Sequence, residues 1–365
     1  MLRKVMFLMA VAWATATGAE IVRDIPYAPE NGRFGLGDLY LPDTVDLNTP
    51  VVLLIHGGGW TGLDRESVRG IAEFFREKLG CAVYSIEYRL ARKVGNRWPA
   101  CGDDCIKAAN WLFSTGFRKH AGFMPKKIYI CGGSAGGHLA LWTLVNLPPE
   151  KVAGCISISS IGDPVPDFRK HAGRYRRLFG EGVKEDDLAA MNPVLKIKAG
   201  TAPVLCTHAT EDKVVPISSH KAFAQAYRAA GNICEFFEYP SNTFKGLTGH
   251  CIWVPGSKPH RLIPEIEAEI VAFMKKRATP SANTLYARFL SPPDSTKPWC
   301  YWYWVNGNVD RETITADLES MKEVGFGGVL LVDPRGYDKV VHKPPVKLAF
   351  GSPEWRTMDC IALQL

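Results

Sequence analysis

Apart from the N-terminal stretch Val5–Ala14, the chain of 365 residues has no long apolar run. A helix that spans a bilayer needs about 20 consecutive apolar residues, so we expect no membrane anchor. The formal net charge is only +7, and it falls to +5 if Arg3 and Lys4 are removed. This small excess gives no support to nucleic-acid binding, and we expect no nucleic-acid partner.

The sequence also lacks the paired cysteine spacing of zinc sites. Cys101 and Cys105 have no matching second pair, so we expect no metal site. An exported chain with ten cysteines can form disulfides, but their pairing stays open. Several cysteines lie inside predicted buried strands, where a free thiol packs as a small hydrophobe: Cys81, Cys131, Cys155, Cys206 and Cys234.

The N-terminus has the composition of a secretory signal peptide. Arg3 and Lys4 precede Val5–Ala14, and small residues follow up to Ala19. No cysteine near Ala19 is available to accept a lipid. We therefore predict a signal peptide over residues 1–19 and a soluble protein that is secreted or periplasmic.

A Gly-x-Ser-x-Gly motif lies between a predicted strand and a predicted helix. The apolar run Ile128–Cys131 leads into Gly132, Ser134 and Gly136, and an apolar helix follows. We call this turn the elbow and the helix after it the elbow helix. Glycines permit the tight turn that holds a serine hydroxyl clear of the sheet, and the helix N-terminus favours developing negative charge. The alternative is a structural glycine-rich turn, but the strand–helix context predicts Ser134 as a nucleophile.

A second glycine-rich loop follows the buried strand predicted at Val51–Ile55. It reads His56-Gly57-Gly58-Gly59-Trp60. Acyl transfer needs N–H donors aimed at the oxyanion, and a glycine-rich loop leaves its backbone N–H groups accessible. We predict that Gly57, Gly58 and Ala135 form the oxyanion hole, although the loop alone fits a simple tight turn.

A serine nucleophile needs a base and an acid that orients the base. The strand predicted at Pro203–Thr207 leads to Glu211 and Asp212, and we choose Asp212 as the acid. A further strand, Cys234–Tyr239, precedes a loop that contains His250, the predicted base.

The other histidines near these motifs are predicted to have no catalytic role. The sequence favours a surface position for His220, a core position for His208 and a place in the elbow helix for His138, while His260 follows the loop.

The predicted elements alternate between strand and helix, which indicates an α/β fold with a doubly wound, mostly parallel sheet. Ligands bind such sheets at the carboxyl ends of the strands, where the predicted catalytic residues fall. The predicted strands are Ile21–Tyr27, Phe34–Leu41, Val51–Ile55, Ala82–Ile86, Ile128–Cys131, Val152–Ile158, Pro203–Thr207 and Cys234–Tyr239, and the predicted helices include Asp64–Leu79, Asp104–Phe113, one from Ile217 and Ile263–Lys276.

A basic cluster lies between two predicted strands, where an excursion often caps the active site. We interpret it as the solvated surface of a lid, and attraction of an acidic polymer such as pectin is the alternative. The cluster consists of Arg169, Lys170, His171, Arg174, Arg176 and Arg177.

Three motifs carry a family resemblance: the loop at His56–Trp60, Tyr88-Arg89-Leu90, and the stretch Gly132–Ala140. Together they resemble secreted acetyl-esterases and feruloyl-esterase-like α/β-hydrolases related to hormone-sensitive lipase. The resemblance covers about residues 20–278, and the order Ser134, Asp212, His250 agrees with it. It implies hydrolysis of carboxylic esters, often acyl groups on plant polysaccharides, without a cofactor.

After this domain the composition changes. Residues 279–289 read as a linker, and residues 290–365 begin a different segment. Its aromatic run Pro298–Val309 and its Gly351-Ser352-Pro353-Glu354-Trp355 resemble the start of rhamnosidase-type glycoside hydrolases. Because a β/α barrel needs about 250 residues, we expect an incomplete β/α segment without activity of its own, either a remnant or a truncated reading frame.

The sequence therefore predicts an exported serine carboxylesterase that acts on an acylated carbohydrate substrate, possibly in pectin. Two alternatives stay open: an arylformamidase- or peptidase-like amide hydrolase, and a non-catalytic carbohydrate-binding protein on a hydrolase fold. The acyl group, the sugar and the oligomeric state also stay open.

Overall fold

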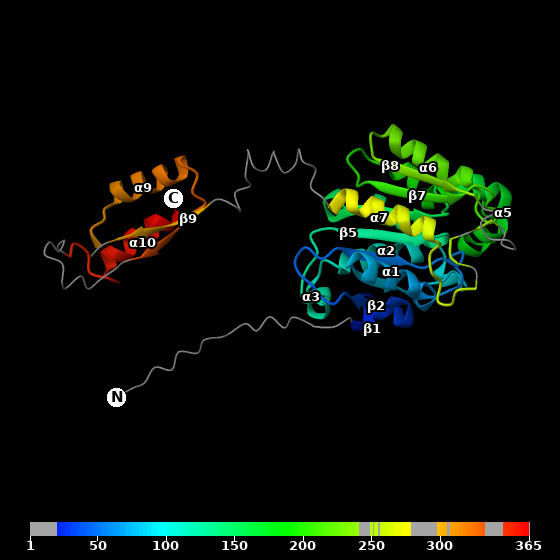
Figure 1. Cartoon of the computed structure of the whole chain (residues 1–365), viewed down its shortest axis with the longest axis horizontal. Helices are drawn as coiled ribbons and strands as arrows, with labels where there is room; N and C mark the ends of the chain where they lie inside the picture. Colours follow the sequence, from blue (N-terminus) through cyan, green and yellow to red (C-terminus); the bar gives the residue numbers. More distant parts are fainter. Residues whose placement is uncertain are drawn as a thin grey trace, which may run out of the picture. The chain divides into compact units, whose positions relative to one another are not determined.

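The computed structural model describes residues 20–240, 249–250, 252–254, 256–278, 298–304, 307–332 and 346–364. The predicted signal peptide and the predicted linker lie outside these residues. The chain divides into two compact units, Met1–Ala278 and Thr279–Leu365, which are described separately below (Figure 1). Within the described residues, no helix is both long enough and apolar enough to cross a membrane.

The first unit contains a sheet of eight strands in the order β1-β2-β4-β3-β5-β6-β7-β8. The pairs β1–β2 and β2–β4 are antiparallel, and every other neighbouring pair is parallel. The predicted mostly parallel sheet is therefore confirmed. The strands are β1 (Glu20–Pro26), β2 (Leu36–Leu41), β3 (Val51–Ile55), β4 (Ala82–Ile86), β5 (Ile128–Gly133), β6 (Val152–Ile158), β7 (Val204–Ala209) and β8 (Cys234–Tyr239).

Helices cover both faces of this sheet. They are α1 (Arg69–Leu79), α2 (Ala100–Trp111), α3 (Thr115–Ala121), α4 (Ala135–Asn146), α5 (Pro164–Phe179), α6 (Ile217–Ala229) and α7 (Pro264–Ala278). Short 3-10 helices lie at η1 (Pro29–Gly35), η2 (Arg65–Val68), η3 (Val94–Asn96), η4 (Pro149–Lys151), η5 (Glu185–Met191) and η6 (Pro193–Lys196).

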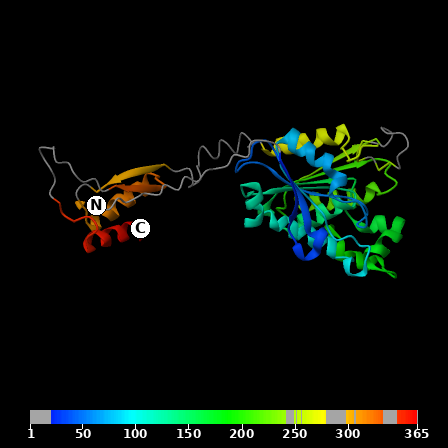
Figure 2. The ribbon, with the colours of Figure 1, turned by 90° about the horizontal axis from the view of Figure 1, so that it is seen from below.

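The core has two layers because side chains of a strand alternate between the faces of the sheet. On β3, Val52 and Leu54 pack with α1 and α7, which lie together on one side of the sheet (Figure 2). Val51, Leu53 and Ile55 pack on the opposite face with side chains of α2, α4 and α6. The unbroken apolar run therefore corresponds to a central strand buried on both faces.

Most differences from the predicted elements are at their ends. The strand predicted from Phe34 begins at Leu36, because residues up to Gly35 form η1 with Gly32 at a φ of 56°. Asp64 caps η2 by accepting a hydrogen bond from the N–H of Ser67, and α1 starts only at Arg69. The sequence did not predict α3, although Ser114 caps its start and Gly122 ends it.

The five cysteines expected in the core are buried, as predicted, and each of them is free. Burial raises the pKa of the Cys131 thiol, which lies directly before Gly132 of the Gly-x-Ser-x-Gly motif. This thiol is therefore protonated near neutral pH, which agrees with a packing role.

The second unit contains two parallel strands, β9 (Trp299–Tyr303) and β10 (Gly328–Val332), joined through α9 (Arg311–Glu323) and followed by α10 (Pro353–Gln364). Trp302 and Trp304 are buried with Ile314 in a small separate core. Trp299, Tyr301 and Tyr303 alternate with them and are 70%, 64% and 55% exposed. The aromatic residues of the predicted run are thus divided between a buried and an exposed face, and residues 305–306 of the run lie outside the described residues.

Candidate active site

The elbow turn connects β5 directly to α4 and holds Ser134 in an unusual backbone conformation. Its φ of 57° and ψ of −124° lie in a backbone region that residues other than glycine rarely adopt. A Cβ on Gly132 would lie 2.3 Å from the carbonyl oxygen of Gly136. A Cβ on Gly136 would lie 2.3 Å from the carbonyl oxygen of Ile55. Both glycines of the motif are therefore required by backbone packing, and Ser134 is fixed between them.

The predicted oxyanion loop lies beside this turn because β3 and β5 are parallel neighbours. Ile55 pairs with Gly132 across the sheet, so residues after Ile55 continue next to the elbow. A Cβ on Gly57 would come within 3.4 Å of the Cβ of Ser134. Gly58 has a φ of 99° and lies so close to Gly62 that only glycine fits. The structure thus brings the loop next to Ser134, and the assignment of Gly57, Gly58 and Ala135 as oxyanion donors stays a prediction.

The buried side chain of Tyr88 packs against the predicted oxyanion loop. The Tyr88 hydroxyl lies 3.0 Å from the carbonyl oxygens of both His56 and Gly57, and its ring stacks on His56 at 4.2 Å. The next residue, Arg89, pairs with the buried carboxylate of Asp104, with 2.7 Å between Nη2 and Oδ1. The Tyr88-Arg89 motif therefore has a physical role in the fold, which the sequence revealed only as a family resemblance.

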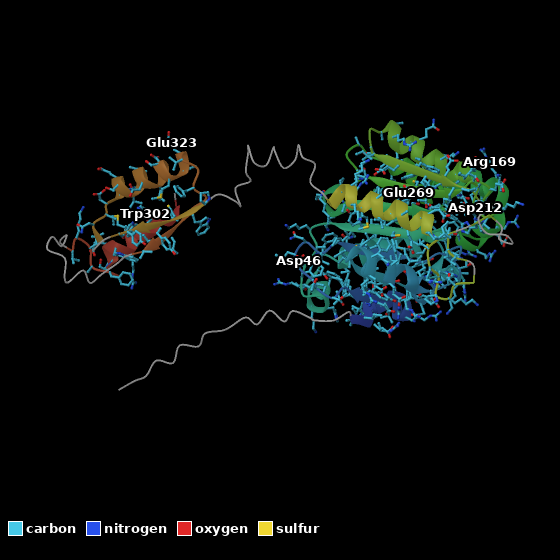
Figure 3. All side chains as sticks on the ribbon, viewed as in Figure 1. Asp46, Arg169, Asp212, Glu269, Trp302 and Glu323 are labelled. Carbon is cyan, nitrogen blue, oxygen red and sulfur yellow. The ribbon has the colours of Figure 1, made fainter. Side chains whose placement is uncertain are left out.

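Asp212 follows β7 at the carboxyl end of the sheet, and its side chain is buried (Figure 3). Oδ1 accepts hydrogen bonds from the N–H groups of Val214 and Val215 at 2.8 and 2.9 Å. Oδ2 accepts a hydrogen bond from Nδ1 of His250 at 2.6 Å. Burial alone would raise the pKa of Asp212, but hydrogen bonds from His208, His250 and Val215 lower it overall, so the carboxylate is ionised.

The pairing of Asp212 with His250 joins residues 38 positions apart. Gly249 makes it possible, because a Cβ there would lie 2.1 Å from the carbonyl oxygen of Glu211. Since Nδ1 of His250 donates to Asp212, the lone pair of the neutral ring is on Nε2, the atom that a general base uses. Nε2 has no hydrogen-bond partner among the described residues. Glu211, the other acid considered, is exposed.

Of the other histidines considered in the sequence, three are buried and one stacks on a tryptophan. His208 is a buried core histidine, as expected, and His138 is buried with Nε2 2.9 Å from the carbonyl oxygen of Met191. The surface position predicted for His220 is wrong, because α6 packs this side chain against β7, where it is fully buried. His260 lies after the loop and stacks on Trp253, with 4.1 Å between the ring centres.

The basic cluster lies entirely on α5. Arg169 pairs with Glu185 at 2.7 Å, Arg174 with Asp167 at 3.2 Å, and Arg176 with Glu181 at 3.9 Å. Arg174 also donates to the carbonyl oxygen of Val214, two residues after Asp212. These contacts satisfy much of the local positive charge within the excursion and connect the excursion to the loop that carries Asp212.

No cluster of three or more His, Cys, Asp or Glu side chains that could hold a metal ion occurs among the described residues. The arrangement of Ser134, the glycine-rich loop and the Asp212–His250 pair is instead suited to nucleophilic acyl transfer.

Comparison with known proteins identifies the family. Residues 52–245 match the family model of the alpha/beta hydrolase fold. The chain belongs to the α/β-hydrolase family. Residues 290–364 match the alpha-L-rhamnosidase family model, which confirms the resemblance predicted for the second unit.

Three similar proteins give the range of this α/β-hydrolase's relatives. It is 24% identical to a kynurenine formamidase of Salmo salar over 53% of this chain and 64% of that protein. It is 35% identical to the carboxylesterase NlhH of Mycobacterium tuberculosis over 30% of this chain and 34% of that protein. The fold resembles a truncated carbohydrate esterase from gut microbiota, with a TM-score of 0.60, 18% identity, and coverage of 73% of this chain and 98% of that chain.

The chain spans less than two thirds of the length of the salmon formamidase. At the level of the family, these likenesses confirm the predicted enzyme class, a serine ester hydrolase.

We predict that Ser134→Ala lowers kcat for a small aryl acetate by about 10⁴-fold or more, since only the oxyanion donors and substrate binding remain. Ser160→Ala, which removes another buried hydroxyl near α4, serves as the matched control and should keep its activity. Steady-state hydrolysis by purified, folded variants measures both. Near-normal turnover in Ser134→Ala would contradict the elbow interpretation.

His250→Ala should lower kcat almost as much as Ser134→Ala, because the two residues act as one unit. His260→Ala should have little effect on the same aryl acetate, since its ring stacks on Trp253 and not on Asp212. Measured kcat values for the two variants test the assignment of the base. If His260 proved essential and His250 dispensable, the base would have to be reassigned.

Proposed function

We propose that this chain is an exported serine carboxylesterase that removes acetyl or other small acyl groups from plant-type polysaccharides or oligosaccharides. The main support is the short hydrogen bond between His250 and Asp212 at the same edge of the sheet as the strained turn of Ser134. The composition of residues 1–19, outside the described residues, supports export.

The proposed mechanism follows from the roles that this geometry permits. The Ser134 hydroxyl attacks the ester carbonyl while Nε2 of His250 takes its proton. Asp212 holds the ring in the tautomer with its proton on Nδ1 and stabilises the imidazolium that forms. The N–H groups of Gly57, Gly58 and Ala135 bind the oxyanion. His250 then gives the proton to the leaving alcohol, and water hydrolyses the acyl-enzyme.

A cavity near the loop of His250 supports a carbohydrate leaving group. His250 lies edge-on to Trp253, with 6.4 Å between ring centres, and Trp253 stacks on His260. His260 lines a cavity of about 450 Å³, a volume within the range of small-molecule sites. Its wall offers both charged groups and an apolar contact, as a sugar ring requires: Leu63, Asp64, Glu66, Ser67, Arg69, Lys258 and Pro259.

The second unit gives support to one class of polysaccharide as the substrate. Its match to alpha-L-rhamnosidases covers residues 290–364. Because a rhamnosidase-like segment and an esterase occur in one chain, we favour an acylated polysaccharide that contains rhamnose, such as pectin. The likeness to a carbohydrate esterase from gut microbiota agrees with this substrate class.

A second candidate function is hydrolysis of an N-formyl aromatic amide. It is favoured by the similarity to kynurenine formamidases of two fishes, at 24% and 23% identity. The same nucleophile, base and oxyanion donors serve ester and amide cleavage, so only the substrate distinguishes the two candidates.

We expect the protein to release acid from acetylated or feruloylated polysaccharides and to act poorly on N-formyl aromatic amides. His260→Ala should raise KM for an acetylated oligosaccharide several-fold and leave kcat/KM for an aryl acetate nearly unchanged, because only the larger leaving group reaches the cavity. Acid release measured over a substrate panel tests both statements. A clear preference for the formyl amide would favour the second candidate instead.

A shortened chain that ends at Arg277 should keep the esterase activity of the full chain, because the first unit has its own core and contains all the predicted catalytic residues. The full chain should release no rhamnose from an aryl rhamnoside. Rhamnose release by the full chain, lost on shortening, would show that the protein is bifunctional.

A further inference from the structure

Two buried histidines form a chain of contacts that ends at Asp212. His208 is on β7 and His220 is on α6, and both side chains are fully buried. Nε2 of His208 lies 3.1 Å from the carbonyl oxygen of Val215 and 3.4 Å from Oδ2 of Asp212. Nδ1 of His208 lies 3.0 Å from Nδ1 of His220. A continuous polar chain therefore runs from α6 to the carboxylate that orients His250.

The contacts fix one proton of this chain and require a second. A carbonyl oxygen only accepts, so Nε2 of His208 carries the proton that faces Val215 and Asp212. The Nδ1 atoms of His208 and His220 lie at hydrogen-bond distance, so one of them donates and the other accepts. Nε2 of His220 is buried and has no hydrogen-bond partner among the described residues.

We propose that His208 and His220 are positioning residues that hold Asp212 in the orientation required by His250. This inference rests on the proposed serine-esterase function. Nε2–H of His208 is directed at both Val215 and Asp212, while Val215 itself donates to Oδ1 of Asp212. His208 thus fixes the carboxylate and the turn that carries it, and His220 fixes the ring of His208.

The presence of a histidine at position 220 agrees with a positioning role. Burial, together with the neighbouring His208, lowers the pKa of His220 well below its usual value, so this ring is neutral near neutral pH. A buried imidazole with an unpartnered nitrogen carries a desolvation cost that an aliphatic side chain would avoid. A purely structural position on α6 would be better filled by leucine, whereas a hydrogen-bond partner for Nδ1 of His208 requires a polar ring or amide.

The test compares variants that remove a donor with variants that keep it. His220→Leu and His208→Leu should lower kcat for an aryl acetate about 10-fold or more, with KM changed less than about two-fold. Asn places an N–H near the position of histidine Nδ1, and Gln places one near Nε2. His220→Asn and His208→Gln should therefore recover most of the activity. Tyr227 lies on the same helix as His220, and its hydroxyl donates a buried hydrogen bond to the carbonyl oxygen of Ala202. Tyr227→Phe, which removes this bond, is the control and should leave kcat unchanged.

A second measurement separates this inference from the proposed function. The downfield proton resonance of the His250 Nδ1–H bonded to Asp212 reports the pairing whether or not an ester is cleaved. It should shift or vanish in His208→Leu and His220→Leu and persist in Tyr227→Phe. If the wild type cleaves no ester but the resonance responds in this way, the proposed function fails and the positioning role stands. An unchanged resonance, or a fall in kcat that His208→Gln and His220→Asn do not recover, would overturn the inference.

Discussion

The candidate site depends on a close approach of two backbone segments, the end of β3 and the start of α4. A side chain at Gly136 would collide with the carbonyl oxygens of Ile55 and His56. With glycine there, α4 lies next to the loop that contains Gly57, and Ser134 is held in its strained conformation at a cost of about 1–3 kcal/mol. The positions of Ser134 and of the loop that contains Gly57 are therefore set by the backbone of the sheet.

The second constraint is the need to keep one buried carboxylate charged. Two backbone amides and Nδ1 of His250 bond to Asp212, and Nε2 of His208 lies 3.4 Å away. Burial opposes ionisation, and these donors outweigh it, so the pKa of Asp212 is lowered. A charged acid orients the His250 ring in a way that a neutral acid could not, and this links the packing of β7 and α6 to the chemistry at Nε2 of His250.

The elements that a few adjacent residues specify could be predicted from the sequence. The elbow turn and the run Val51–Ile55 are each specified by a few adjacent residues, so their type and place were predictable. The Asp212–His250 contact was inferred from the order of motifs, because no local pattern joins residues so far apart. His220 was misplaced although a helical pattern was available: His220, Phe223, Ala224 and Tyr227 recur at the spacing of one buried face of α6. Because histidine is polar, the sequence favours an exposed position for His220. The sequence does not show the contact with His208 that offsets the cost of burying this ring.

The second unit resembles alpha-L-rhamnosidases, and we predict that it has no activity of its own. Its strands bury Trp302 and Trp304 against helices and leave Trp299, Tyr301 and Tyr303 exposed on the other face. Glycoside hydrolysis generally requires two carboxylates facing one sugar across about 5–9.5 Å. Here Asp317 accepts a hydrogen bond from Nε1 of Trp302, and Asp310 caps α9 while pairing with Lys347. Both of these carboxylates contact groups of the local fold, which agrees with the prediction that this unit releases no rhamnose.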